Sequence, residues 1–378
     1  MVNVALVGLG KMGLSHFSLI NAHDDVKVVG VCDSSGYVLD VLAKYTGVAT
    51  YTDYTRMLDS EPVEAVVIST PSKLHAPMVR QALERGLHVF CEKPFCLDPL
   101  ESAALATSAK ERRLVTQVGY HNRFVGAFAE VKRLLDSGAL GRTTHVLAEA
   151  YGPVVLKAKG TTWRSQKDEG GGALFDYAAH PLDLLGWYFG RPDTVSGTVM
   201  NGVFSSQIED EVYTTINWAD GLSGHLSVNW SDESQRKMTT KLTIWGTNGR
   251  INVDRQECQV YLREAVPSLP ELEPGWNVRY TTELTQPVNF YVRGEEYSAQ
   301  HEAWVRRIER NEPNGTADFE EAAITDQMLD AILRSDSREV VTPLEVAPEL
   351  VARQPKLPWW RRRRRSRSAV RTPARIGA

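Results

Sequence analysis

Hydrophobic and polar positions follow two different periodic patterns along this chain. In the first 120 residues, short valine-rich runs are separated by longer segments in which apolar residues recur at helical spacing. Continuous apolar runs are typical of buried parallel strands, and the segments between them are typical of crossover helices. The pattern predicts strands at 2–7, 26–32, 48–51, 65–69, 87–91 and 114–118, and helices at 14–22, 37–45, 75–85 and 100–112. This order predicts an α/β fold with a doubly wound parallel sheet.

The pattern of apolar and polar positions changes after residue 123. Residues 193–262 alternate between apolar and polar positions and contain the turn dipeptides Asp220-Gly221 and Asn248-Gly249, which is typical of an open antiparallel sheet. Helices are expected at 126–135, 172–188, 295–310 and 319–335, the last two closing this second unit, with a further strand at 143–150. We therefore predict a first domain at 1–123, a second α/β domain at 124–345 and a disordered tail at 346–378.

Charge is divided unevenly between the body of the chain and its end. The formal net charge is −4, but residues 361–378 hold eight arginines and no acid, which leaves 35 basic against 47 acidic side chains elsewhere. An acidic body argues against nucleic-acid binding by the folded part. For the tail, which also carries Trp359 and Trp360, attachment to nucleic acid or an anionic membrane is open, and a solvated extension is preferred.

Composition narrows the class of protein further. No apolar run is long enough to span a bilayer, and the first residues resemble a strand rather than a signal peptide. The four cysteines lack the spacing of a metal site, and reduced thiols of a cytoplasmic protein are expected: Cys32, Cys91, Cys96 and Cys258. No metal is expected, and neither a catalytic-serine elbow nor a P-loop occurs.

A glycine motif links the first strand to the first helix. In the stretch Gly8-Leu9-Gly10-Lys11-Met12-Gly13, the glycines allow a tight turn, close approach of a pyrophosphate and close strand–helix packing. Asp33 ends the second strand, where an acid accepts hydrogen bonds from the adenosine ribose and repels a 2′-phosphate. The motif predicts a dinucleotide site with NAD favoured over NADP; a glycine turn without a ligand is the alternative.

Further polar residues follow the other strands at their carboxyl ends, where ligands bind in such sheets. Two groups are expected to contact the cofactor, namely Ser69, Thr70 and Pro71 with His75 just beyond, and Glu92 and Lys93 before Pro94. A third group consists of Tyr120, His121, Asn122 and Arg123. Lys93 either hydrogen-bonds a substrate oxygen or pairs with Glu92 at the surface. For His75 we favour a structural role beside the cofactor. Substrate contact and interdomain packing are equally open for the 120–123 segment.

A second set of candidates lies in the second domain. Asp176 and His180 stand four residues apart in the predicted helix, so the carboxylate is expected to orient the imidazole as a base. A helix-surface pair without function is the alternative. Asp183, one turn further, is expected to be solvated or to accept a substrate hydroxyl. Trp163 and Arg164 either close over the nicotinamide and substrate or anchor a loop.

With these motifs in this order, the chain resembles the Gfo/Idh/MocA oxidoreductases over about residues 2–335. The resemblance rests on the glycine motif, Asp33, residues 69–71, Glu92-Lys93-Pro94 and the spacing of Gly172, Asp176 and His180. It implies a Rossmann domain followed by an open-sheet domain that forms homodimers or homotetramers, an active-site trio of Lys93, Asp176 and His180, and a cis Lys93–Pro94 peptide. One position departs from the family pattern, because Ala178 stands where relatives often have glycine.

The resemblance and the motifs together predict an NAD-dependent dehydrogenase of a secondary alcohol on a sugar, cyclitol or sugar derivative. His180 would take the hydroxyl proton while Lys93 hydrogen-bonds the same oxygen. Two alternatives share the architecture. One is a glycosidase that oxidises its sugar only transiently, and the other is a non-enzymatic sensor of dinucleotide and sugar.

Overall fold

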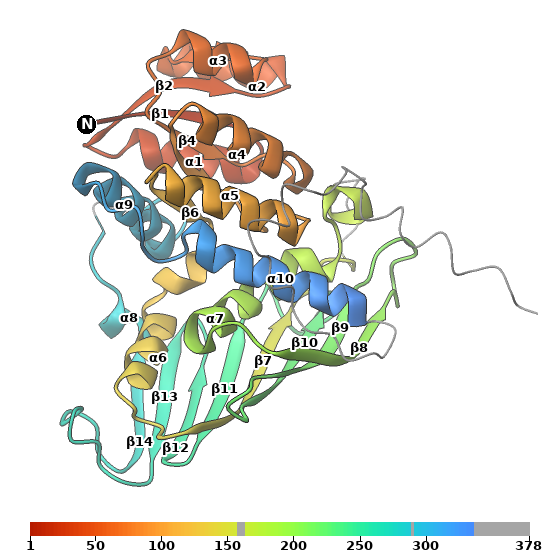
Figure 1. The fold of residues 1–378 in the computed structure, drawn as a ribbon, viewed down its shortest axis with the longest axis vertical. Coiled ribbons are helices and arrows are strands. Elements are labelled where there is room, and N and C mark those ends of the chain that lie inside the picture. The colour runs from red at the N-terminus through yellow and green to blue at the C-terminus, as the bar shows by residue number, and fades with distance from the viewer. Residues whose placement is uncertain (157–162, 289–290, 336–378) are drawn as a thin grey trace, which may run out of the picture.

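The computed structural model describes residues 1–156, 163–288 and 291–335, which form two sheets with helices packed on them (Figure 1). The predicted tail at 346–378 lies outside the described residues. Figure 1 shows the first sheet and its helices at one end of the molecule and the second sheet at the other, with α10 (Phe319–Ser335) running between them.

The first sheet has six parallel strands, as the sequence predicts, and their order is β3-β2-β1-β4-β5-β6. Its strands are β1 (Val2–Val7), β2 (Val26–Cys32), β3 (Ala49–Tyr51), β4 (Ala65–Ile68), β5 (His88–Cys91) and β6 (Thr116–Val118). All four residues of β4 are buried, because both faces of the sheet are covered. The reversal of strand order between β1 and β4 places the carboxyl ends of these two strands at a crevice suited to a ligand.

Five helices connect these strands: α1 (Lys11–Asn21), α2 (Gly36–Thr46), α3 (Tyr54–Ser60), α4 (His75–Glu84) and α5 (Pro99–Glu111). The short helix α3 was not expected from the apolar pattern. Asp53 begins it by accepting a hydrogen bond from the Arg56 backbone N–H at 2.8 Å, which is a side-chain cap.

The second sheet has eight strands in the order β14-β13-β12-β11-β7-β10-β9-β8. They are β7 (Thr143–Tyr151), β8 (Thr194–Asn201), β9 (Glu211–Asn217), β10 (Ser223–Asn229), β11 (Lys241–Gly246), β12 (Gly249–Val253), β13 (Glu257–Leu262) and β14 (Gly275–Tyr280). All neighbours are antiparallel except β7 and β10, which run parallel. The predicted open antiparallel sheet is confirmed, with β14 as an unexpected edge strand.

One face of this sheet is covered by helices and the other is open. The helices α6 (Gly126–Asp136), α7 (Ala179–Phe189) and α10 pack on it, and a π-helical turn at Leu174–Ala178 precedes α7. Along β7, β9 and β10, residues alternate between buried and partly exposed. Large apolar side chains gather on the open side at the β13–β14 edge, where Trp276 is 54% and Tyr280 is 52% exposed.

The two last long helices do not both close the second unit, contrary to the expectation from chain order. α9 (Glu295–Arg310) contributes Trp304 and Val305 to the core that holds Val4 and Phe90 of the first sheet. α10 packs on both α5 and α7. The chain therefore returns to the first unit after it has built the second, and this return joins the two halves. A short helix, α8 (Thr281–Leu284), precedes α9. None of the helices described is long and apolar enough to cross a membrane.

Candidate active site

The glycine turn after β1 has the geometry that its sequence predicts. Gly8 has a φ of +86°, and a Cβ there would lie 2.7 Å from the backbone of Ser69 and Thr70. A Cβ on Gly13 would overlap the carbonyl oxygen of Gly8, whereas one on Gly10 would meet nothing within 4 Å. Ser69 Oγ donates to the Gly8 carbonyl at 2.8 Å and so ties the turn to the end of β4. The glycines at 8 and 13 serve packing, and open space lies above Gly10.

The first turn of α1 is free to receive an anion. Lys11 and Met12 begin this helix, Gly10 supplies no side-chain cap, and no acidic residue lies in the first turn. Asp33 buttresses the turn from β2, because its Oδ2 accepts the Leu9 N–H at 2.5 Å and its Oδ1 accepts the Ser35 N–H at 2.8 Å. Unoccupied helix N–H groups beside a fixed carboxylate suit the pyrophosphate and ribose of a dinucleotide.

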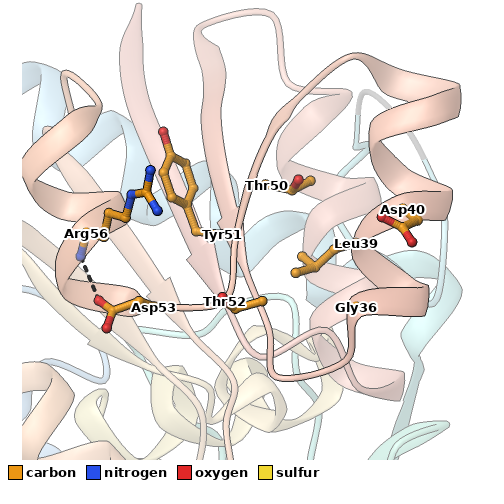
Figure 2. Close-up of a pocket in the computed structure, with 8 residues that line it drawn as sticks. All are labelled: Gly36, Leu39, Asp40, Thr50, Tyr51, Thr52, Asp53 and Arg56. Carbon is orange, nitrogen blue, oxygen red and sulfur yellow. Dashed lines mark hydrogen bonds between the residues drawn. The ribbon is translucent and has the colours of Figure 1, made fainter.

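A pocket of about 310 Å³ opens beyond Asp33 at the ends of β2 and β3 (Figure 2). The Asp33 backbone N–H donates to the Tyr51 carbonyl at 3.1 Å, so the acid and the pocket share one wall. Figure 2 shows Arg56 beside Tyr51, with Asp40 on the helix at the other side of the pocket. The lining residues are Gly36, Leu39, Asp40, Thr50, Tyr51, Thr52, Asp53 and Arg56. Two carboxylates and one guanidinium make this lining acidic on balance.

His75 has the structural role that its position suggested. Its Nδ1 lies 2.9 Å from the Pro94 carbonyl and its Nε2 lies 2.9 Å from the Thr70 carbonyl. Burial lowers its pKa and outweighs the two carbonyl contacts, which act in the opposite direction, and the ring lies between the loops after β4 and β5. Thr70 is partly buried and Pro71 is exposed at the same crevice.

Lys93, at the carboxyl end of β5, contacts the second domain. Its Nζ donates to Asp176 Oδ1 at 2.9 Å and to the Asp176 backbone carbonyl at 2.8 Å, although the two residues are 83 positions apart. Arg164 Nε donates to the other oxygen, Oδ2, at 2.9 Å. Burial opposes ionisation of Asp176, but the two cations outweigh it and lower its pKa. The Lys93–Pro94 peptide is cis, as the resemblance implied.

The expected hydrogen bond between Asp176 and His180 is absent from the described hydrogen bonds, in which both carboxylate oxygens bond to Lys93 and Arg164. The physical reason is the π-helical turn at Leu174–Ala178, which rotates Asp176 out of the register of an α-helical i, i+4 pair. His180 is buried, and within the described structure its Nδ1 has no hydrogen-bond partner. Burial first, and then the charge of Lys93 and the neighbouring His121, lower the pKa of His180 well below its usual value.

His121 completes this wall of the site. Its ring lies 5.0 Å from that of His180 in an edge contact and stacks on Tyr297 of α9 at 4.7 Å. Burial lowers its pKa to about 3, with smaller contributions from Arg255, Lys93 and Arg293. The Arg293 guanidinium lies 5.2 Å from the Tyr297 ring. No signal in the sequence points to Tyr297 or the two arginines, because Arg255 lies in the β12–β13 connection, Arg293 lies between α8 (Thr281–Leu284) and α9, and Tyr297 lies in α9, far from every motif.

The segment 120–123 divides between the site and the core. Tyr120 is fully buried, and Asn122 Nδ2 faces Thr240 Oγ1 at 3.5 Å. Arg123 donates from Nη2 to Asp183 Oδ1 at 2.7 Å and from Nε to Oδ2 at 2.9 Å, and it also bonds to Glu321 of α10. The expectation of a solvated Asp183 is therefore wrong, because the residue is buried in this ion pair. For Arg123 and Asp183 the geometry favours interdomain packing over substrate contact.

Two further predictions have a limited outcome. The side chain of Trp163 lies outside the described residues, although its backbone belongs to a short 3₁₀ turn with Arg164. Across the described chain, no group of three or more histidine, cysteine or acidic side chains is arranged to hold a metal ion. The four cysteines are free and buried in the described structure.

Comparison with known proteins identifies the relatives of this chain. Residues 2–120 match the model of an oxidoreductase family with an NAD-binding Rossmann fold, and residues 128–252 match the GFO/IDH/MocA C-terminal domain. The scyllo-inositol 2-dehydrogenase (NAD(+)) of Bacillus subtilis (strain 168) is 28% identical, over 74% of this chain and 82% of the relative. A 2,7-anhydro-N-acetylneuraminate hydratase of Escherichia coli (strain K12) is 25% identical, over 70% of each.

The fold is shared with solved structures as well. A levoglucosan dehydrogenase in complex with NADH and levoglucosan superimposes with a TM-score of 0.81 at 23% identity, covering 91% of this chain and all of the other. The predicted resemblance and fold class are thus confirmed. The chain belongs to the Gfo/Idh/MocA family of oxidoreductases, and its first sheet is the NAD-binding Rossmann domain of that family.

Proposed function

We propose that this protein transfers a hydride between NAD and a secondary alcohol or ketone of a sugar or cyclitol. One observation carries the proposal: Lys93 of the dinucleotide-binding domain reaches Asp176 at 2.9 Å, beside the buried ring of His180. A cation and a neutral imidazole from two different domains thereby lie close enough for the charge of Lys93 to act on His180. The relatives named for inositol and levoglucosan oxidation support a polyhydroxylated substrate.

In this proposal His180 accepts the hydroxyl proton of the alcohol. Its lowered pKa keeps the imidazole neutral at working pH, which is the form that can accept a proton. Lys93 is a hydrogen-bond donor that stabilises the developing alkoxide, and Asp176 holds its ammonium in place. Bound NAD supplies the hydride acceptor. Asp176 acts on Lys93 rather than on His180, which alters the division of roles expected from helical spacing.

The dinucleotide is expected to lie along the glycine turn, with its pyrophosphate over Gly10 and the α1 N-terminus and its adenosine at Asp33. The acid and the acidic pocket beyond it disfavour a 2′-phosphate. Titration with NADH and NADPH, followed by quenching of protein fluorescence, tests this preference. Tighter binding of NADPH would overturn it.

The function itself is tested by a screen of NAD reduction at 340 nm with inositols, aldoses, anhydrosugars and nucleotide sugars. We expect NADH formation with at least one cyclic polyol and loss of the signal in Lys93→Met. No NADH formation with any cyclic polyol, from a protein that binds NADH, would contradict the dehydrogenase proposal.

A second candidate is a reaction that uses NAD without net redox change. It is favoured by one observation, namely that a relative over 70% of this chain is named a hydratase. The glycosidase alternative belongs to the same class. Either one would consume substrate without accumulating NADH, so product analysis by mass spectrometry alongside the 340 nm signal separates them from a dehydrogenase.

We also propose that the open face of the second sheet forms a homodimer or homotetramer interface. Exposed Tyr261, Trp276, Val278 and Tyr280 at its β13–β14 edge support this assignment. The paired substitutions Trp276→Glu and Tyr280→Glu are expected to yield monomers in sedimentation experiments. An unchanged mass would contradict this use of the surface.

A further inference from the structure

A buried hydrogen-bonded chain of three side chains lies behind Lys93. His301 Nε2 of α9 lies 2.7 Å from His16 Nδ1 of α1, and His16 Nε2 lies 2.7 Å from Glu92 Oε1 at the end of β5. Glu92 Oε2 then accepts the backbone N–H of Lys93 at 3.1 Å. These residues are 76 and 285 positions from His16 in sequence, so the fold alone brings them together.

The surroundings of the two histidines exclude water, and the Glu92 side chain is only 12% exposed. His16 and His301 are essentially unexposed, and the Phe90 ring lies 5.2 Å from His16 and 4.7 Å from His301. On the other side, a Cβ on Gly119 would lie 2.8 Å from Glu92 Oε1, so the carboxylate fills the space against that backbone. Hydrogen bonds in such an apolar enclosure have few alternatives, because no solvent can replace a lost partner.

The direction of the hydrogen bonds follows from the carboxylate. Since ionised Glu92 only accepts, His16 Nε2 donates to it, and His16 Nδ1 shares the second hydrogen bond with His301 Nε2. His301 Nδ1 has no hydrogen-bond partner in the described chain. Burial lowers the pKa of His301 well below its usual value, which agrees with a neutral ring.

We propose that His16 is a positioning residue of the active site. By donating to Glu92 it holds the carboxylate that fixes the Lys93 backbone, and this sets where the Lys93 ammonium meets Asp176 and the substrate oxygen. Glu92 therefore serves Lys93 rather than the dinucleotide, in contrast to the cofactor contact expected from sequence. The kinetic consequence rests on the proposed dehydrogenase function.

The titratable groups around Glu92 come from every packed element. They are His16 of α1, His75 of α4, His121 after β6, Tyr297 of α9, and its chain neighbours Cys91 and Lys93. Burial favours a neutral Glu92, but the hydrogen bond and charge of His16, followed by Lys93 and His121, lower its pKa overall. Without the His16 donor, the effect of burial dominates and raises the pKa of Glu92, so that Glu92 is protonated at higher pH.

Two matched substitutions test the proposal. The amide nitrogen of Gln approximates imidazole Nε2 and that of Asn approximates Nδ1, so H16Q keeps a donor toward Glu92 whereas H16N keeps only the side toward His301. We expect H16N to lower kcat about tenfold to a hundredfold with NADH affinity changed less than about twofold, and H16Q to restore most of the loss. H16N should also gain an acidic limb in its pH–kcat profile, and the H16N/E92Q double variant should lack that limb.

Equal kcat and pH profiles for H16N and H16Q would overturn the proposal. E92Q tests the same contact at Glu92: its carbonyl oxygen can take the position of Oε1 or of Oε2 but not of both, so either His16 or the Lys93 N–H loses its acceptor and kcat should fall at unchanged NADH affinity. Weakened NADH binding of E92Q at unchanged kcat would contradict the proposal and would show that Glu92 contacts the cofactor. Infrared pH-difference spectra need no substrate: a protonated-carboxyl band in H16N that is missing from H16N/E92Q supports the proposal even if no polyol is oxidised, and its absence refutes it.

Discussion

Replacing Arg123 by methionine should destabilise the protein strongly, and more so at alkaline pH. Its guanidinium makes hydrogen bonds of 2.7 and 2.9 Å to Asp183 and bonds to Glu321, in a place where the Arg123 and Asp183 side chains are both only 1% exposed. Removing one partner of a buried ion pair leaves an uncompensated charge and costs about 3–5 kcal/mol. If Arg123 instead bound substrate at an open site, the substitution would change KM with little loss of stability.

The pH dependence follows from Asp183. Burial raises its pKa to about 6 even beside Arg123, so the folded state binds this proton more tightly than the unfolded chain, whose Asp pKa is about 3.9. Such a group stabilises the fold fully below pH 3.9, and that stabilisation is lost as pH rises through 6. Without Arg123 the folded pKa rises further, and the deficit of R123M relative to wild type should therefore grow by about 1.4 kcal/mol for each pH unit above 6.

Urea unfolding at pH 5.5 and pH 8.0, followed by circular dichroism, measures this deficit. The control is D183N in both backgrounds, because an amide does not titrate and the deficit of R123M/D183N relative to D183N should be the same at both pH values. A deficit of R123M below about 1 kcal/mol, or one that does not change between the two pH values, would refute the reasoning.

Three further outcomes are expected. Lys93→Met should lower kcat at least about a hundredfold while NADH affinity stays unchanged in fluorescence titration, because the ammonium contacts Asp176 and not the glycine turn; parallel loss of affinity would contradict this assignment. Gly10→Ala should keep the wild-type Tm but lower NADH affinity, whereas Gly13→Ala should lower both Tm and NADH affinity, since only the Cβ on Gly13 overlaps protein atoms. Equal losses of Tm in the two variants would contradict this distinction. The acidic limb of kcat/KM should lie well below pH 6.5, because the neutral form of His180 persists below its usual pKa, and a limb near 6.5 that disappears in His180→Asn would be inconsistent with this.

The parts of the fold that could be predicted are those encoded by local pattern. The six strands of the first sheet and the glycine turn each combine a buried run, a turn residue and a helix within about thirty residues. The predicted helices 295–310 and 319–335 likewise coincide with α9 and α10. Amphipathic spacing predicts that a helix has a buried face, but it does not predict which surface covers that face. For this reason α9 was assigned to the wrong partner, and Tyr297 and His301 were missed with it.

The candidate site shows the same limit at the level of single side chains. Strand ends brought Lys93 and the segment 120–123 to one edge of the first sheet, as position along the chain predicts. Helical spacing then paired Asp176 with His180, whereas one π-helical turn redirects the carboxylate to Lys93. Arg123 and Asp183 are charged residues that the sequence offers as substrate ligands, but they form a buried ion pair with each other, so we do not assign them to the substrate. Chemistry at this crevice therefore depends on interdomain pairings that no short motif contains, and the histidine chain behind Lys93 is the pairing most directly open to test.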